Sequence, residues 1–453
     1  MLDLLIKNGA ISQEQRMDIG VEKGKIVKKS RIIEERADSV VDAHGNFVMP
    51  GAIDPHVHFD EPGFTFREDF ASGSAGAAAG GITTVIDMPD TSLPPVTNLE
   101  ALRNKLEIVG KKSWVDFAFW GGVCGGFDKK EMDELKPHVA GYKMYDTSSM
   151  ETYPRVTKGE MRDILGHAER IVGLHAEDPE IVSWFTARER SKKGGMESWC
   201  RSRPPIAEVV SIAGAAAIAR EVKGELHIVH LSSGAGAEVI RREQKEYKGI
   251  TCETCPHYLL LDGDDLKKKG VIAKTTPPVR TKRDNAILWE SLRTGVINFV
   301  ASDHAACDFK NEKVGKGVWE AYSGIAGVET LVPLIVSEGV NKGRLTLERL
   351  VDVLSRGAAK RFGLHPKKGS LSVGSDADVT IVDLDREWIF NASNLKSKCK
   401  ASPFDGMELK GKVVTTIVRG KVVYDEGKLM CREGWGKFVE PPVKNVGRCE
   451  GRL

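Results

Sequence analysis

Histidine, lysine and aspartate side chains stand at the ends of short apolar runs in residues 47–304. Asp54-Pro-His-Val-His58 closes the first run, and alternation along a strand would place His56 and His58 on one face. Two imidazoles on one face can share a divalent metal ion. Four later runs end with further candidates, namely Lys143, His175, His230 and Asp303. Taken singly, each also has an ordinary structural interpretation, such as a partly buried histidine or an ion-paired lysine.

Lys143 stands among apolar neighbours in Gly141-Tyr-Lys-Met-Tyr145. Burial lowers the pKa of a lysine, and the neutral amine can add carbon dioxide to form a carbamate. A carbamate is an anionic ligand whose two oxygens can bridge two metal ions, and imidazole and carboxylate suit zinc or manganese. The recurrence of such residues at run ends therefore predicts one metal site. His227 would face away from His230 on a regular strand, so we expect it to be packed or at the surface.

Strands alternating with helices must position these residues. Apolar residues at helical spacing lie between several of the runs, for example in 206–222 and 285–292. This alternation predicts an α/β fold of the (β/α)8 barrel type, in which chemistry gathers at the carboxyl ends of the strands. A doubly wound open sheet is the alternative, but no G-x-G-x-x-G follows an early strand. The strand-like runs are 47–58, 81–89, 115–123, 139–145, 171–177, 225–232, 250–260 and 297–304.

The two flanks contain β-like pieces that are too short to bury a core alone. Alternation and β-branched residues in 374–383 and 412–424 predict strands. We expect residues 1–50 and 366–430 to form one small composite β-sandwich domain beside a catalytic barrel of residues 51–365. Glycine and proline residues predict a loosely held tail for 431–453.

The composition excludes several classes of protein. Among 453 residues, 66 Lys and Arg face 64 Asp and Glu, and the resulting charge of +2 argues against a nucleic-acid or anionic-membrane binder. The sequence has neither a signal-peptide pattern nor a spanning apolar stretch. Eight cysteines are scattered without a framework pattern, which predicts reduced thiols and a cytoplasmic protein.

Several motifs together resemble the amidohydrolase superfamily, and within it the cyclic amidohydrolases: allantoinases, dihydroorotases and dihydropyrimidinases (hydantoinases). The resemblance extends from residue 1 to about residue 430. The motifs are His56-Val-His-Phe-Asp-Glu-Pro-Gly63, Ala79-Gly-Gly-Ile-Thr-Thr-Val-Ile-Asp-Met-Pro89, Tyr142-Lys143, Leu174-His-Ala-Glu177, His230-Leu-Ser-Ser233, Cys255-Pro-His-Tyr258, Thr276-Pro-Pro-Val-Arg280 and Ser302-Asp-His304.

The resemblance implies a hydrolase with two zinc ions, or cobalt or manganese in their place. It assigns His56, His58 and Asp303 to one ion, His175 and His230 to the other, and a carbamylated Lys143 as the bridge. Asp303 would carry the proton from the attacking hydroxide to the departing ring nitrogen. A homodimer or homotetramer and a small cyclic amide substrate are further implications. Members that have lost their metal ligands and serve as scaffolds are the remote alternative, and here every ligand is present.

The expected substrate is allantoin, with dihydroorotate and a hydantoin or dihydropyrimidine as alternatives. Dihydroorotases typically carry an arginine and an asparagine where this chain has Asp60 and Asp90, and two acids would repel the dihydroorotate carboxylate. Phe59-Asp-Glu-Pro-Gly63 is close to the allantoinase pattern, whereas Gly324-Ile-Ala-Gly-Val-Glu-Thr330 is nearer to the dihydroorotase one. Arg67 or Arg203 would be the substitute for the missing arginine. Candidate substrate contacts are Phe59, Asp60, Asp90, Thr276 and Gly324, with His257 and His304 either in the pocket or purely structural.

Overall fold

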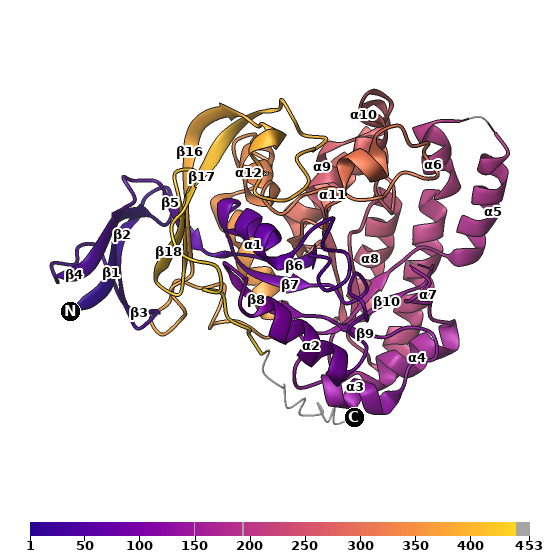
Figure 1. Cartoon of the computed structure of the whole chain (residues 1–453), viewed down its shortest axis with the longest axis horizontal. Helices are drawn as coiled ribbons and strands as arrows, with labels where there is room; N and C mark the ends of the chain where they lie inside the picture. Colours follow the sequence, from indigo (N-terminus) through magenta and orange to yellow (C-terminus); the bar gives the residue numbers. More distant parts are fainter. Residues whose placement is uncertain (149, 193, 441–453) are drawn as a thin grey trace.

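The computed structural model describes residues 1–148, 150–192 and 194–440. A sheet built from both ends of the chain lies beside a larger body of helices and parallel strands (Figure 1). No helix among the described residues has the length and apolar character needed to cross a membrane.

The terminal sheet has nine strands and joins the two ends of the chain through an antiparallel pair, β5 with β16. Its order is β19-β18-β17-β16-β5-β1-β2-β3, with β4 paired to β1. Alternate residues of its strands, among them Leu4, Ile19, Val48 and Ile381, bury a separate small core. The strands are β1 (Leu2–Ala10), β2 (Arg16–Glu22), β3 (Lys25–Ser30), β4 (Ala37–Asp42), β5 (Phe47–Pro50), β16 (Val379–Ile389), β17 (Glu408–Val418), β18 (Lys421–Asp425) and β19 (Lys428–Leu429). The predicted domain boundaries themselves stay a prediction.

The body between these flanks contains two parallel sheets, which confirms the α/β class. Their orders are β14-β13-β12-β11-β10-β9 and β15-β6-β7-β8. Every residue of β6 and β7 is buried, as expected for parallel strands covered on both faces. The strands are β6 (Ala52–His58), β7 (Ile82–Asp87), β8 (Asp116–Phe119), β9 (Gly121–Gly122), β10 (Tyr142–Tyr145), β11 (Val172–His175), β12 (Leu226–Ile228), β13 (Ile250–Thr254), β14 (Phe299–Val300) and β15 (His304–Ala305).

The helices begin where the sequence offers a side chain that caps them. The Asp69 carboxylate accepts from the Ser72 backbone N–H at the start of α1, and Thr281 with Asp284 forms a capping box on α11. The predicted helices 206–222 and 285–292 fall within α7 and α11. The helices are α1 (Phe70–Ala79), α2 (Leu99–Val109), α3 (Lys129–Leu135), α4 (Lys158–His167), α5 (Pro179–Arg190), α6 (Met196–Ser202), α7 (Pro205–Val222), α8 (Gly234–Glu246), α9 (Pro256–Leu260), α10 (Gly263–Lys269), α11 (Lys282–Thr294), α12 (Leu331–Ile335), α13 (Leu347–Val351) and α14 (Gly357–Arg361), and the shorter or wider turns are Gly270–Ala273, Phe309–Lys313, Val336–Val340, Asp352–Arg356 and Ala392–Asn394.

The segment 431–440 is held more firmly than its composition indicates. The Val439 N–H donates to the Phe117 carbonyl at 2.8 Å, and the ring of Phe438 stacks on Phe119 with centroids 5.5 Å apart. The segment is therefore attached to β8 by a backbone hydrogen bond and by aromatic stacking. The rest of the predicted tail, 441–453, lies outside the described residues.

Candidate metal centre

The predicted metal-binding residues come together at the carboxyl ends of the parallel strands. His58 and His175 are the last residues of β6 and β11, His230 follows β12, and Asp303 precedes β15. With His56 they line one cavity of about 310 Å³. Lys143, on β10, is fully buried and does not line the cavity. Strand order therefore gathers residues that are up to 247 positions apart in the chain, from His56 to Asp303.

A first group consists of His56, His58 and Asp303. The Asp303 Oδ1 atom lies 3.2 Å from His56 Nε2 and 3.5 Å from His58 Nε2. Behind His56, the Nδ1 atom lies 2.5 Å from Glu253 Oε1. With its Nδ1 proton donated to Glu253, as in metal-binding histidines, His56 turns the Nε2 lone pair towards the Asp303 carboxylate, and among the described residues this buried atom has no hydrogen-bond partner.

A second group is the pair His175 and His230. His175 Nε2 lies 2.9 Å from Glu177 Oε2, so its proton is donated there and the Nδ1 lone pair points the other way. It points at His230 Nε2, also 2.9 Å away. Burial lowers the pKa of both imidazoles and keeps them neutral, which is the form that ligates metals.

Lys143 contributes a buried nitrogen between these groups. Among the described residues its Nζ has no hydrogen-bond partner, and it lies 4.7 Å from the centre of the Tyr145 ring. Burial lowers the pKa of Lys143 despite the nearby Asp90 and Asp303 carboxylates. A buried amine without acceptors favours the neutral form, which is the form that reacts with carbon dioxide.

The arrangement fits a metal ion. The ligand atoms of His56, His58 and Asp303 all lie within 4.8 Å of one another. An imidazole lone pair that faces a carboxylate in a buried site is repelled unless a cation lies between them. Neutral imidazole and carboxylate are ligands that zinc accepts. The structure thus brings together a His/Asp group able to hold a metal ion.

Three of the seven predicted substrate contacts line the cavity: Asp90, Thr276 and Gly324. The Asp90 carboxylate accepts from the Tyr145 hydroxyl at 2.8 Å. Gly324 has a φ of +159°, and a Cβ there would meet the Ala305 carbonyl at 2.4 Å, so glycine is required for the close approach.

The other four do not line this cavity. Phe59 turns into the core and packs edge-on against Phe70 and His304. Asp60 is fully buried, and burial raises its pKa to about 8. His257 is buried, and a nitrogen of its ring lies within 4.8 Å of an Asp303 carboxylate oxygen and of the Cys255 sulfur.

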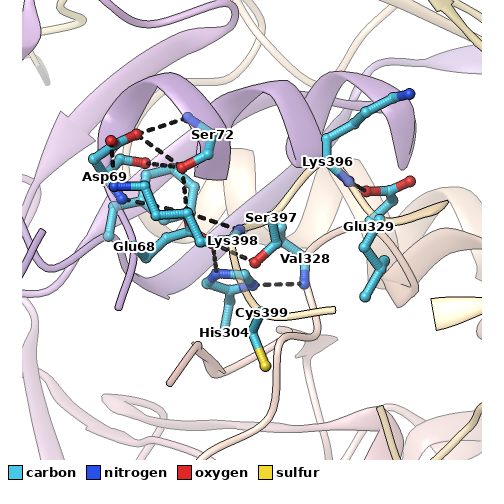
Figure 2. A network of polar contacts seen from close by, with 12 residues as sticks. Glu68, Asp69, Ser72, His304, Val328, Glu329, Lys396, Ser397, Lys398 and Cys399 are labelled. Carbon is cyan, nitrogen blue, oxygen red and sulfur yellow. Dashed lines mark hydrogen bonds and ion pairs between the residues drawn. The ribbon is translucent and has the colours of Figure 1, made fainter. Parts of the chain in front are cut away.

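His304 takes the structural one of its two expected roles. Its side chain is fully buried, its Nε2 lies 3.2 Å from Glu68 Oε2, and the Val328 N–H donates to its Nδ1 (Figure 2). Asp303 precedes β15 with a φ of +47° and its carboxylate lies beside His56 and His58, whereas the His304 ring bonds to Glu68.

The carboxylates behind the histidines were not predicted as site residues. Glu177 stands two positions after His175, and Glu253 stands two positions before Cys255 on β13, so an acid in an apolar strand was the available signal. His227 is packed, as one of the two expectations had it. Its ring stacks on Phe299 and its Nε2 lies 3.2 Å from Glu253 Oε2.

Two arginines line the cavity, and each is already bound to a carboxylate. Arg67 donates to Glu312 Oε1 through Nη2 at 2.6 Å and through Nε at 2.8 Å. Arg203 donates to Glu177. Trp199 forms another part of the wall, with the Arg203 guanidinium 5.1 Å from its ring. The cavity is therefore polar, with its cationic groups largely neutralised.

Comparison with known proteins agrees with this geometry. Residues 47–423 match the sequence profile described as the amidohydrolase family. The chain is 37% identical to an L-hydantoinase of Paenarthrobacter aurescens and 36% identical to an allantoinase of Rubrobacter xylanophilus, over 97% of this chain and 98% of each relative. It is 34% identical to a dihydroorotase of Methanothermobacter thermautotrophicus, over 99% of both. The solved L-hydantoinase (dihydropyrimidinase) from Arthrobacter aurescens matches with a TM-score of 0.93 and 36% identity, over 97% of this chain and all of that one.

Proposed function

The chain belongs to the amidohydrolase family, and we propose that it opens the ring of a 5-substituted hydantoin, with allantoin as its preferred substrate. Allantoin is a hydantoin that carries a ureido group at carbon 5, so allantoinases and hydantoinases cleave the same kind of ring. Relatives of both kinds stand at 36–37% identity across nearly the whole chain. The observation that carries the proposal is the pair of facing ligand groups beside a polar cavity of about 310 Å³.

The state of the cavity arginines favours a neutral ring over dihydroorotate. A substrate carboxylate is held best by a cation whose charge is not already paired, and Arg67 and Arg203 each form an ion pair, with Glu312 and Glu177, although each keeps further N–H donors. Asp90 adds a further acid to the wall. Dihydroorotate is the second candidate, because two arginines do line the cavity and a dihydroorotase is 34% identical.

We also infer that the two parallel sheets close into one (β/α)8 barrel. Only Trp120 separates β8 from β9, and its N–H donates to the Asp87 carbonyl of β7. Three residues separate β14 from β15, and β15 pairs with β6. The TM-score of 0.93 to the solved L-hydantoinase supports the same closure.

We assign two zinc ions to the ligand groups described above. His56, His58 and Asp303 would hold one ion, His175 and His230 the other, and a carbamate on Lys143 would bridge them, its buried neutral amine being suited to that modification. When bound, such a pair of ions lowers the pKa of a water molecule and polarises the amide carbonyl. Glu253 and Glu177 fix the tautomers of His56 and His175, so that the correct nitrogen faces the ion.

Asp303 moves the proton in this proposal. Its carboxylate lines the cavity, is 14% exposed, and lies beside the histidines of the first group. Asp303 accepts a proton as the water oxygen bonds to the ring carbonyl carbon. It then returns that proton to the ring nitrogen as the carbon–nitrogen bond breaks, and the product is an N-carbamoyl acid.

A kinetic panel on zinc-loaded protein tests the substrate. We expect the highest kcat/KM for allantoin, then for other 5-substituted hydantoins, and at least about tenfold less for dihydroorotate, equal to roughly 1.4 kcal/mol of transition-state binding. Asp303→Asn, which keeps the shape of the side chain but not its basicity, is the matched control for contaminating activity. A preference for dihydroorotate of about tenfold or more would transfer the assignment to that substrate.

A further inference from the structure

Glu68 is a fully buried carboxylate outside the cavity that collects donors from three separate parts of the chain (Figure 2). Its Oε2 accepts from His304 Nε2 at 3.2 Å and from the Ser397 hydroxyl. Its Oε1 accepts from the Ser72 hydroxyl and from the Lys398 N–H at 3.4 Å. Only an ionised carboxylate accepts from all of these donors at once, since an amide would turn its own N–H groups towards some of them.

His304 connects this carboxylate to the metal centre. Because the Val328 N–H donates to His304 Nδ1, the ring proton lies on Nε2 and is donated to Glu68. His304 also pairs with Val57 of β6, the strand that carries the histidines of the first ligand group. The imidazole is thus held from both of its nitrogens while its backbone fixes β15 beside β6.

The residue before His304 needs such support. Asp303 has a φ of +47°, in the left-handed region that residues with a side chain rarely adopt. Strained backbone of this kind persists where the surroundings over-determine it. The Ser302 N–H donates to Asp54 on one side of Asp303, and the His304 ring is anchored on the other.

We propose that Glu68 acts through His304 as a positioning residue, which aims the Asp303 carboxylate at the metal and the leaving nitrogen. Ser397 and Lys398, which come after β16, donate hydrogen bonds to Glu68 and so help to hold it. A segment more than 90 residues beyond Asp303 in the chain therefore helps to order the site. The inference rests on the proposed function for its kinetic readout and on the proposed metal ligands for its spectroscopic readout.

Glu68→Gln tests it, with Glu329→Gln as the matched control. The Glu329 carboxylate accepts from the Lys396 N–H at 2.7 Å, so it holds the same segment without bonding to the His304 ring (Figure 2). In Glu68→Gln we expect kcat to fall about 30-fold with KM within about twofold, since the cavity wall is unchanged. In the cobalt-loaded protein, the visible d–d bands should shift in Glu68→Gln and match the wild type in Glu329→Gln.

A double variant tests whether Glu68 and His304 act together, and a milder variant replaces Glu68→Gln if that protein does not fold. If Glu68 and His304 act as a unit, Glu68→Gln with His304→Asn should be no worse than the worse single variant. Should Glu68→Gln fail to fold, Ser397→Ala, which removes one donor, should still lower kcat a few-fold and shift the cobalt bands. The inference would be overturned if folded Glu68→Gln kept the kcat and the cobalt bands of the wild type. If Glu68→Gln does not fold, the same result in Ser397→Ala would overturn it. Equal losses in Glu329→Gln would overturn it as well. Because the bands report coordination without turnover, a wrong substrate assignment would leave this result readable.

Discussion

Two buried clusters of ionisable side chains lie at opposite ends of the parallel strands. At the carboxyl ends, the ligand atoms of His56, His58 and Asp303 all lie within 4.8 Å of one another, and although burial opposes it, the Asp90 and Asp303 carboxylates raise the pKa of His58. At the amino end of β8, three aspartates, Asp116, Asp376 and Asp378, have their oxygens equally close together. There the Lys368 ammonium lies 3.0 Å from Asp376 and 2.6 Å from Asp378, and it also bonds to Asp116.

The difference separates a structural cluster from a candidate metal site. Both clusters have the residue types and spacing of metal ligands, so spacing does not distinguish them. The pKa of Lys368 is raised by its three carboxylate partners although burial opposes this, whereas burial lowers the pKa of Lys143. A cluster whose carboxylates share a buried lysine already has its counter-charge, and one in which an imidazole lone pair faces a carboxylate favours an ion from outside.

Lys143→Ala should produce the largest effect. Without the buried amine the site loses the proposed bridging ligand, so kcat/KM should fall by more than about 1,000-fold while the fold is kept. Steady-state kinetics and circular dichroism measure the two. Short carboxylic acids added to the variant should restore part of the activity by taking the place of the carbamate. Full activity in Lys143→Ala would show that Lys143 is not a bridging ligand. The comparison between Lys143 at the metal site and Lys368 in the aspartate cluster would then no longer hold.

Lys368→Ala should have the next largest effect, and on stability instead of catalysis. It removes the cation that three buried carboxylates share. Asp116 keeps its pair with Arg419 and Asp376 keeps its pair with Lys25, but Asp378 loses its lysine partner, which costs about 3–5 kcal/mol of the free energy of unfolding in denaturant titrations. The vacated cluster should then resemble a metal site, and millimolar Mn²⁺ should recover part of the loss in protein already loaded with zinc. Lys368→Ala with Asp376→Asn is the control, since one charge fewer should weaken that recovery. No response to any divalent ion would contradict the view that Lys368 stands in for a metal.

Glu253→Gln should have an intermediate effect, on metal affinity. The carboxylate fixes the tautomer of His56 from 2.5 Å, and loss of such an outer partner costs about 10–100-fold in affinity. Competition with a chromophoric chelator measures it. Thr251→Val is the control, because the Thr251 hydroxyl contacts His227 and not His56. Equal zinc affinity in Glu253→Gln and the wild type would show that His56 is oriented without it.

The residues that face the cavity were predictable because their signal is local. His-x-His at the end of an apolar run, together with the rule that parallel strands present their carboxyl ends at one edge, is enough to group His56, His58, His175, His230 and Asp303. The α/β class and the strands of both flanks follow from alternation in the same way. The paired flanks join through β5 and β16 because neither flank buries a core alone.

The contacts behind these residues were not predictable because they join distant strands. Glu253 meets His56 across 197 positions, and Lys368 meets Asp116 across 252. A single acid in an apolar strand does not reveal its partner. The sequence left His304 either in the pocket or purely structural, because nothing local shows that its ring bonds to Glu68, 236 positions earlier in the chain.

Lys25→Met should have the smallest effect. It tests the exposed edge of the cluster formed by Lys368 and its three aspartates. Lys25 Nζ lies 2.6 Å from Asp376 Oδ1 and is 44% exposed, so its loss should cost less than about 1 kcal/mol at neutral pH. Burial raises the pKa of Asp376, but Lys368 and Lys25 outweigh it and hold that pKa below its usual value of 3.8. The stability that this carboxylate contributes is therefore present above about pH 3.8 and lost as the pH falls below it. Lys25→Met should reduce that acid-dependent loss in urea titrations between pH 5 and 2.5, whereas Lys130→Met, in an exposed pair with Glu134, should not. An unchanged acid dependence would mean that Lys368 alone keeps Asp376 ionised. The aspartate cluster would then need no cation other than Lys368, which would sharpen its difference from the candidate metal site.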